Sequence, residues 1–197
     1  MITENKTEIA FVEFPKIARL SRECIVTEKI DGTNAQILIT EDGQFLTGSR
    51  SRWITPENDN FGFSRWAHEH KDELMALGVG QHFGEWWGSG IQRGYGLPKG
   101  EKRFSLFNVS RWDDNLRDPI KFPTAKPACC HVVPVLYKGI FETSFVIGAL
   151  TVLGAIGSKA APGFMKPEGV VCWHVAAGMG FKKTLEKDEV PKSMANS

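Results

Sequence analysis

The sequence lacks the two commonest nucleotide-binding loops, since it contains neither a GxxxxGK[ST] stretch nor a GxGxxG stretch. It also lacks paired CxxC sequences, and the spacing of its four cysteines fits neither a disulfide framework nor a zinc site of that type. The formal net charge is only +1, which excludes a broadly basic protein and leaves local patches as the means of binding a polyanion.

No segment has the continuous apolar run of a secretory signal, because residues 1–16 mix Glu and Lys with apolar side chains. The most apolar stretch, residues 145–157, is too short to span a bilayer and is predicted to form a buried helix. The chain has 197 residues, of which 42% are hydrophobic and 24% charged, as is ordinary for a globular domain. These features predict an intracellular protein in a reducing setting, with no membrane partner.

Hydrophobic periodicity predicts an α+β domain that is rich in strands. Two segments, 60–77 and 143–156, have helical spacing, and residues 113–126 have the composition of a surface loop. The predicted strands cover 9–14, 24–28, 37–40, 45–49, 82–88, 103–109, 132–137, 167–173 and 181–185.

The stretch Glu28-Lys29-Ile30-Asp31-Gly32-Thr33-Asn34 connects two of these strands. Asp31-Gly32 is a turn dipeptide, so Lys29 is expected at the rim of a sheet, on a loop without core contacts. A lysine has an ordinary pKa of about 10.4. It attacks phosphorus or carbonyl carbon only when desolvation or cationic neighbours lower that pKa. The alternative is a hairpin with a solvated lysine.

Other strand ends carry charged and aromatic side chains. Glu85 lies in an aromatic strand between glycines, where a carboxylate needs a partner, and alternation places it on the face of Trp87 and not of Trp86. Aromatics that stack on a base, carboxylates that accept ribose hydroxyls and cations that neutralise phosphates together predict a nucleoside triphosphate site. The further candidates at strand ends are Arg50, Arg52, Phe104, Phe107, Glu168, Lys182 and Lys183.

The order of these motifs resembles the covalent nucleotidyltransferases, the superfamily of ATP-dependent DNA ligases, RNA ligases and mRNA capping enzymes. Two features are most similar to small phage-type nick-sealing RNA ligases: the residues Gly84-Glu85-Trp86-Trp87-Gly88, and Asn34 after the lysine motif. The matching stretches are 28–34 (motif I), 49–52, 83–88 (motif III), 104–109, 168–171 (motif IV) and 181–183 (motif V).

The resemblance implies that Lys29 attacks the α-phosphorus of ATP to form a lysyl-adenylate, which passes to a 5′-phosphate before a 3′-hydroxyl displaces AMP. It implies magnesium, with manganese as an alternative, and RNA or DNA ends or nicks as partners. The implied ligands of ATP are Glu28 through its backbone, Asn34, Arg50 or Arg52, Glu85, Phe107 or Phe104, and Lys182 or Lys183, with Glu168 and Asp31 at the metal.

The implied fold is an antiparallel nucleotidyltransferase domain over residues 1–190 with flanking helices, a frayed tail over 191–197 and no OB domain. The expected molecule is a monomer, and two alternatives stay open: either a protein partner replaces the OB domain of larger ligases, or the protein binds its polynucleotide weakly. Cys172-Trp173 departs from the family at a position where relatives often carry lysine. The side chains of the adjacent Lys182 and Lys183 are expected on opposite faces of a strand, so that only one reaches the phosphates.

The residues of motif III (83–88) favour an RNA ligase over a DNA ligase. Three other activities stay open at this point: a GTP-using capping enzyme, a nucleic-acid end-binding module without catalysis, and a Schiff-base lysine enzyme.

Overall fold

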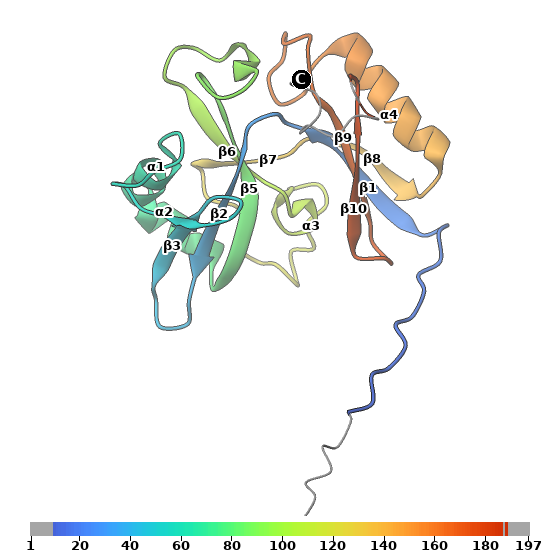
Figure 1. Ribbon diagram of the computed structural model, residues 1–197, viewed down its shortest axis with the longest axis horizontal. Helices are drawn as coiled ribbons and strands as arrows, with labels where there is room; N and C mark the ends of the chain where they lie inside the picture. Colours follow the sequence, from blue (N-terminus) through green and yellow to red (C-terminus); the bar gives the residue numbers. More distant parts are fainter. Residues whose placement is uncertain (1–9, 187, 189–197) are drawn as a thin grey trace, which may run out of the picture.

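The computed structural model describes residues 10–186 and 188, which form two sheets placed side by side, with helices on their outer faces and one short helix between them (Figure 1). The first sheet has the strand order β10-β9-β1-β8 and is antiparallel throughout. Its strands are β1 (Glu23–Lys29), β8 (Val135–Ile140), β9 (Gly169–His174) and β10 (Met179–Thr184).

The second sheet has the order β4-β3-β2-β5-β6-β7 and is antiparallel except for the β6–β7 pair. Its strands are β2 (Thr33–Ile39), β3 (Phe45–Gly48), β4 (Trp53–Ile54), β5 (Gly80–Gly88), β6 (Lys102–Leu106) and β7 (Cys130–Val132). The α+β class and the antiparallel sheets predicted from the sequence are thus confirmed. All strands of the described residues belong to these two sheets, and the span 1–190 for a single domain stays a prediction.

Three apolar clusters hold the layers together. The first lies between the second sheet and the helices α1 (Phe63–Glu69) and α2 (Lys71–Leu74), and the second lies between the first sheet and α4 (Thr143–Ile156). The third fills part of the space between the sheets, beside α3 (Val109–Trp112). Two 3-10 turns, η1 (Met75–Leu77) and η2 (Gly94–Gly96), complete the described helices.

The connection after Lys29 does not form a hairpin. β1 pairs with β8 and β9, whereas β2 pairs with β3 and β5, so the chain crosses from one sheet to the other within residues 30–32. This crossing places the end of β1 and the start of β2 at the junction of the two sheets (Figure 1).

Two predicted strands are shorter or absent. Residues 10–14 have no regular structure, and Phe11 is 90% exposed because no strand pairs with this segment; Ile9 lies outside the described residues. The strand expected over 103–109 ends at Leu106, because the Asn108 side chain accepts a hydrogen bond from Arg111 N and begins α3.

Two other predicted elements are divided. The strand expected over 132–137 is two strands in different sheets, separated by Val133-Pro134, where proline removes a backbone donor. The helix expected over 60–77 begins at Phe63 and breaks at His70, whose backbone leaves the helical region (φ −104°, ψ 16°).

The helix expected over 143–156 has those bounds, but it is only half buried. Val146, Leu150 and Leu153 pack on the sheet, while Val152 and Ile156 are more than half exposed. No helix of the described residues is long and apolar enough to cross a membrane. The tail over 191–197 lies outside the described residues.

Candidate active site

A cavity of about 610 Å³ lies where the two sheets meet. Its lining comes from β1, β5, β9 and the segment around α3, and includes Lys29, Glu85, Phe107 and Trp173. Cavities of this size bind small molecules and cofactors in other proteins.

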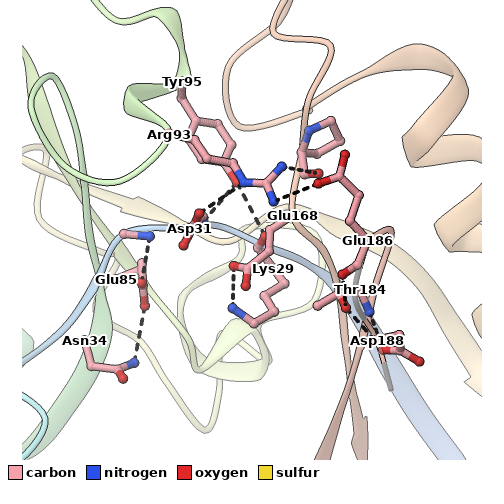
Figure 2. A network of polar contacts seen from close by, with 12 residues as sticks. Lys29, Asp31, Asn34, Glu85, Arg93, Tyr95, Glu168, Thr184, Glu186 and Asp188 are labelled. Carbon is pink, nitrogen blue, oxygen red and sulfur yellow. Dashed lines mark hydrogen bonds and ion pairs between the residues drawn. The ribbon is translucent and has the colours of Figure 1, made fainter. Parts of the chain in front are cut away.

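Lys29 is the last residue of β1 and lines this cavity. Its Nζ lies 2.5 Å from Oε2 of Glu168, a carboxylate that is only 4% exposed and directly precedes β9 (Figure 2). The expectation that Lys29 lies on a loop without core contacts is therefore wrong, because the lysine ends a strand and has a buried partner. The two residues that the sequence placed 139 positions apart meet at the sheet junction.

Glu28 has the opposite environment because side chains alternate along a strand. Its carboxylate is buried and accepts hydrogen bonds from Ser158 Oγ at 2.5 Å, Lys159 N at 2.8 Å and Ala160 N at 3.0 Å. The carboxylate thus anchors the segment after α4 to β1, and only the backbone of Glu28 is left for a nucleotide. The predicted backbone contact stays a prediction.

Glu85 faces the loop that connects the sheets. Its Oε1 accepts from Gly32 N at 3.0 Å and its Oε2 from the Asn34 amide at 3.3 Å (Figure 2). Gly32 has to be glycine here, since a Cβ would lie 2.7 Å from the Cβ of Trp87. Burial raises the pKa of Glu85 to about 7, although the Lys29 charge and the Gly32 amide oppose that rise.

This raised pKa predicts a pH dependence of stability. The folded protein binds the Glu85 proton more tightly than the unfolded chain, whose glutamate pKa is 4.5. The stabilisation is therefore fully present below pH 4.5 and is lost as pH rises through about 7. As the pH rises from about 5 to about 8, we expect the titration of Glu85 to lower the unfolding free energy by about 2 kcal/mol.

Urea unfolding of wild type and Glu85→Gln at about pH 5 and about pH 8 measures this contribution, because the glutamine does not titrate. As the pH rises, the unfolding free energy of wild type should fall by about 2 kcal/mol relative to that of the variant. A difference that does not change with pH would contradict the assignment.

The two aromatic candidates lie in different environments, because Phe104 is within β6 and Phe107 directly follows it. Phe104 is fully buried in the cluster under α1, where it packs on Phe63 with ring centroids 5.0 Å apart. Phe107 is 40% exposed, lines the cavity, and lies beside Phe83, whose carbonyl accepts its backbone N–H. Of the two candidates, only Phe107 is in a position to stack on a base in this cavity.

The two arginine candidates are exposed in the turn between β3 and β4 and do not line the cavity. Strand register brings this turn toward the site, because Gly48 pairs with Gln36, two residues after Asn34, and the Gln36 amide donates to Ser49 O. Arg50 and Arg52 therefore lie at the edge of the second sheet, toward the end of β2 that carries Asn34.

Register also separates the two lysine candidates. Lys182 pairs with Val171, which lines the cavity, so Lys182 is on the cavity face of β10. Lys183 pairs with Val170, which packs under α4, and its Nζ lies 2.8 Å from Asp188. The sequence left the choice between Lys182 and Lys183 open, and the strand register places only Lys182 on the side of the cavity.

The candidate metal ligands are held by cations of the protein itself. Glu168 pairs with Lys29, and Asp31 lies 3.1 Å from Arg93. Among the described residues no three His, Cys, Asp or Glu side chains gather as a metal site. Magnesium commonly uses one or two carboxylates together with phosphate oxygens and water, so these residues fit a cation that binds along with nucleotide phosphates.

Sequence reasoning missed Arg93 and Tyr95, which follow β5 in the stretch Gln92-Arg93-Gly94-Tyr95-Gly96. Arg93 contacts Asp31, and the Tyr95 hydroxyl accepts from Asp31 N at 2.9 Å (Figure 2). The only local signal was an arginine and a tyrosine interleaved with glycines.

Solved structures of an RNA ligase have a similar fold. A mutant of Naegleria gruberi RNA ligase with AMP and Mn has a TM-score of 0.59 and 18% identity over 84% of this chain and 50% of that one. A second mutant, with ATP and Mn, gives a TM-score of 0.60 at 18% identity, with coverage of 84% and 50%. This likeness shows the fold, and the chain spans about half the length of the proteins it matches.

No curated protein sequence matches the chain significantly. The sequence model of the RNA ligase family, in contrast, matches residues 22–184, a stretch that begins just before β1 and ends with β10. It therefore contains both sheets, the cavity between them and the Lys29–Glu168 pair. The chain belongs to the RNA ligase family.

Proposed function

We propose that this protein is an ATP-dependent RNA ligase that works through a covalent lysyl-AMP on Lys29. The observation that carries the proposal is the position of Lys29 at the end of β1, in a cavity between two sheets, with its Nζ 2.5 Å from Glu168. Membership of the RNA ligase family supports RNA ends over DNA ends as the substrate.

In the first step the Lys29 amine attacks the α-phosphorus of ATP. A P–N bond forms, the bond to the bridging oxygen breaks, and pyrophosphate leaves with that electron pair. The amine has to lose its proton for this attack, and the Glu168 carboxylate is the protein acceptor within hydrogen-bond distance. AMP then passes to a 5′-phosphate, and a 3′-hydroxyl displaces it to form the phosphodiester.

The remaining residues position the nucleotide. We infer that adenine stacks on Phe107 and that the ribose hydroxyls bond to Glu85, with Lys182 holding phosphate oxygens from the first sheet. Asn34, which donates to Glu85, keeps that carboxylate oriented or acts on phosphate in a later step. Either Arg50 or Arg52, from the β3–β4 turn, contacts the ribose or the transferred phosphate.

The relatives solved with Mn and with AMP or ATP support a divalent metal, manganese or magnesium, in this reaction. Glu168, with Asp31 as a second carboxylate, would hold it together with the phosphates. When bound, such a cation neutralises charge on the phosphates in the transition state.

The test is incubation of the protein with α-labelled ATP or GTP and magnesium, followed by denaturing electrophoresis. We expect label from ATP alone, labile to acid and removed by pyrophosphate. Label from GTP would indicate a capping enzyme instead. A folded sample that takes no label from either nucleotide would favour an end-binding module without catalysis.

Lys182 and Lys183 provide a matched pair on one strand. Lys182→Ala should raise the half-saturating ATP concentration for labelling about tenfold, because one charge-assisted contact to phosphate is lost. Lys183→Ala should change it far less, since Lys183 is on the α4 face with Asp188. Titration of the labelling rate against ATP measures both, and equal effects would contradict the register argument.

A further inference from the structure

The turn that follows β5 has a strained backbone. Gln92 and Tyr95 have φ values of 43° and 51°, in the left-handed region that residues other than glycine rarely adopt. Such conformations cost free energy and persist where the surrounding structure holds them, often at functional sites. Here the strained turn presents two side chains, Arg93 and Tyr95, to the loop after Lys29.

Arg93 joins three segments with one guanidinium. Its Nε donates to Asp31 Oδ2 at 3.1 Å, and its Nη1 donates to the carbonyls of Lys166 at 3.0 Å and Pro167 at 3.4 Å. Its Nη2 lies 3.8 Å from Glu186, after β10 (Figure 2). Arg93 comes from the second sheet, whereas the Lys166 and Pro167 carbonyls and Glu186 flank strands of the first sheet.

Tyr95 fixes the same loop from its buried side. Its hydroxyl accepts from Asp31 N at 2.9 Å and donates to Lys29 O at 3.5 Å. The ring is 1% exposed and packs against Trp87 and Phe164, with ring centroids 5.2 and 4.6 Å away. Because the Tyr95 ring is packed on both of these side chains, its hydroxyl has a fixed position.

These contacts bracket both partners of the Lys29–Glu168 ion pair. Asp31 is two residues after Lys29, and Pro167 directly precedes Glu168. A single planar guanidinium thus holds the two backbone segments that carry the lysine and the carboxylate, and it does so across the junction of the sheets.

We propose that Arg93 and Tyr95 are positioning residues for lysine adenylation, which together keep the Lys29 amine aligned for attack. The proposal rests on the function proposed above and assigns these residues no contact with the nucleotide. The fork of Arg93 is essential to this role, because a lysine at that position has a point charge and cannot reach all its acceptors at once.

The variants Arg93→Ala, Arg93→Lys and Tyr95→Phe test it in single-turnover labelling with ATP. We expect the maximal rate to fall about tenfold or more, because small misplacements of reacting groups are costly. The half-saturating ATP concentration should change less than about threefold, since no nucleotide contact is lost. Guanidinium chloride at low concentration should restore part of the rate of Arg93→Ala, and methylammonium should not.

Arg65→Ala and Tyr137→Phe are matched controls far from this turn. Arg65 is exposed and pairs with Asp59, and the Tyr137 hydroxyl donates to the Ile140 carbonyl on β8. Both should label like wild type. Maximal rates of Arg93→Ala and Tyr95→Phe within twofold of wild type, or losses that appear only in the ATP requirement, would overturn the proposal.

A second measurement needs no nucleotide and separates this proposal from the proposed function. Modification of Lys29 by trinitrobenzenesulfonate, followed by peptide mapping, should be about fivefold faster in Arg93→Ala, because the amine is no longer held at Glu168. Hydrogen exchange at the Asp31 amide should likewise accelerate in Tyr95→Phe. If wild type takes no label but both changes occur, the proposed function fails and the positioning of Lys29 stands; if neither occurs, the positioning fails.

Discussion

Replacement of Lys29 by arginine is expected to abolish covalent labelling by α-labelled ATP while leaving a folded protein. Arginine keeps the positive charge beside Glu168, which is 4% exposed, but its guanidinium does not deprotonate and cannot act as the nucleophile. Labelling should fall below detection, and circular dichroism should match wild type.

Lys29→Ala should lose labelling too, with an additional loss of about 1–3 kcal/mol in unfolding free energy, because the buried Glu168 carboxylate loses a partner. Lys71→Ala is the control, since Lys71 is exposed on α2, on the outer face of the second sheet, and should label normally. Label that persists in Lys29→Arg would show that another residue is the nucleophile.

The largest loss of stability is expected from the neighbouring residue. Glu28→Ala leaves the Ser158 hydroxyl and the amides of Lys159 and Ala160 without their buried acceptor. We expect the unfolding free energy in urea to fall by about 3–5 kcal/mol. Glu28→Gln keeps one acceptor oxygen and should lose less.

Ser158→Ala, combined with Glu28→Ala in a double-mutant cycle, isolates the coupling between the two side chains. Glu41→Ala, at an exposed turn, should change stability by less than about 0.5 kcal/mol. A Glu28→Ala protein as stable as the Glu41→Ala protein would show that the carboxylate does not anchor the segment after α4.

Much of the fold could be predicted from the sequence because the relevant signals are local. The bounds of α4 follow from its apolar run and from Gly157, β1 follows from the apolar residues Cys24 to Val26, and β5 from its aromatic residues. Alternation along β5 places Trp86 in the cluster under α1 and Trp87 in the cluster between the sheets, as expected for Glu85 and its neighbours.

What could not be predicted depends on contacts between distant residues. The sequence cannot say that β1 and β2 belong to different sheets, because a turn dipeptide followed by a strand also describes a hairpin. Nor can it say that the partner of Glu28 is Ser158, 130 residues later, or that Arg93 lies against the carbonyls of Lys166 and Pro167. Such partners follow from the way in which the two sheets meet.

In the candidate site, too, local motifs could be predicted from the sequence, whereas the choice between neighbouring residues could not. Motif order brought Lys29, Glu85 and Glu168 into one proposal, and the structure places all three at the sheet junction. The choices between Phe104 and Phe107 and between Lys182 and Lys183 needed strand register, which follows from pairing with strands remote in sequence.

The alternation of side chains along β1 also restricts insertions and deletions within this strand. Inserting or deleting one residue between Glu23 and Glu28 would exchange the environments of the last two residues of the strand. The carboxylate would then enter the cavity between the sheets, and the lysine would lie under the segment after α4. The surface loop over 113–126 has no such constraint, so we expect natural length variation among relatives to concentrate there and to be excluded from β1.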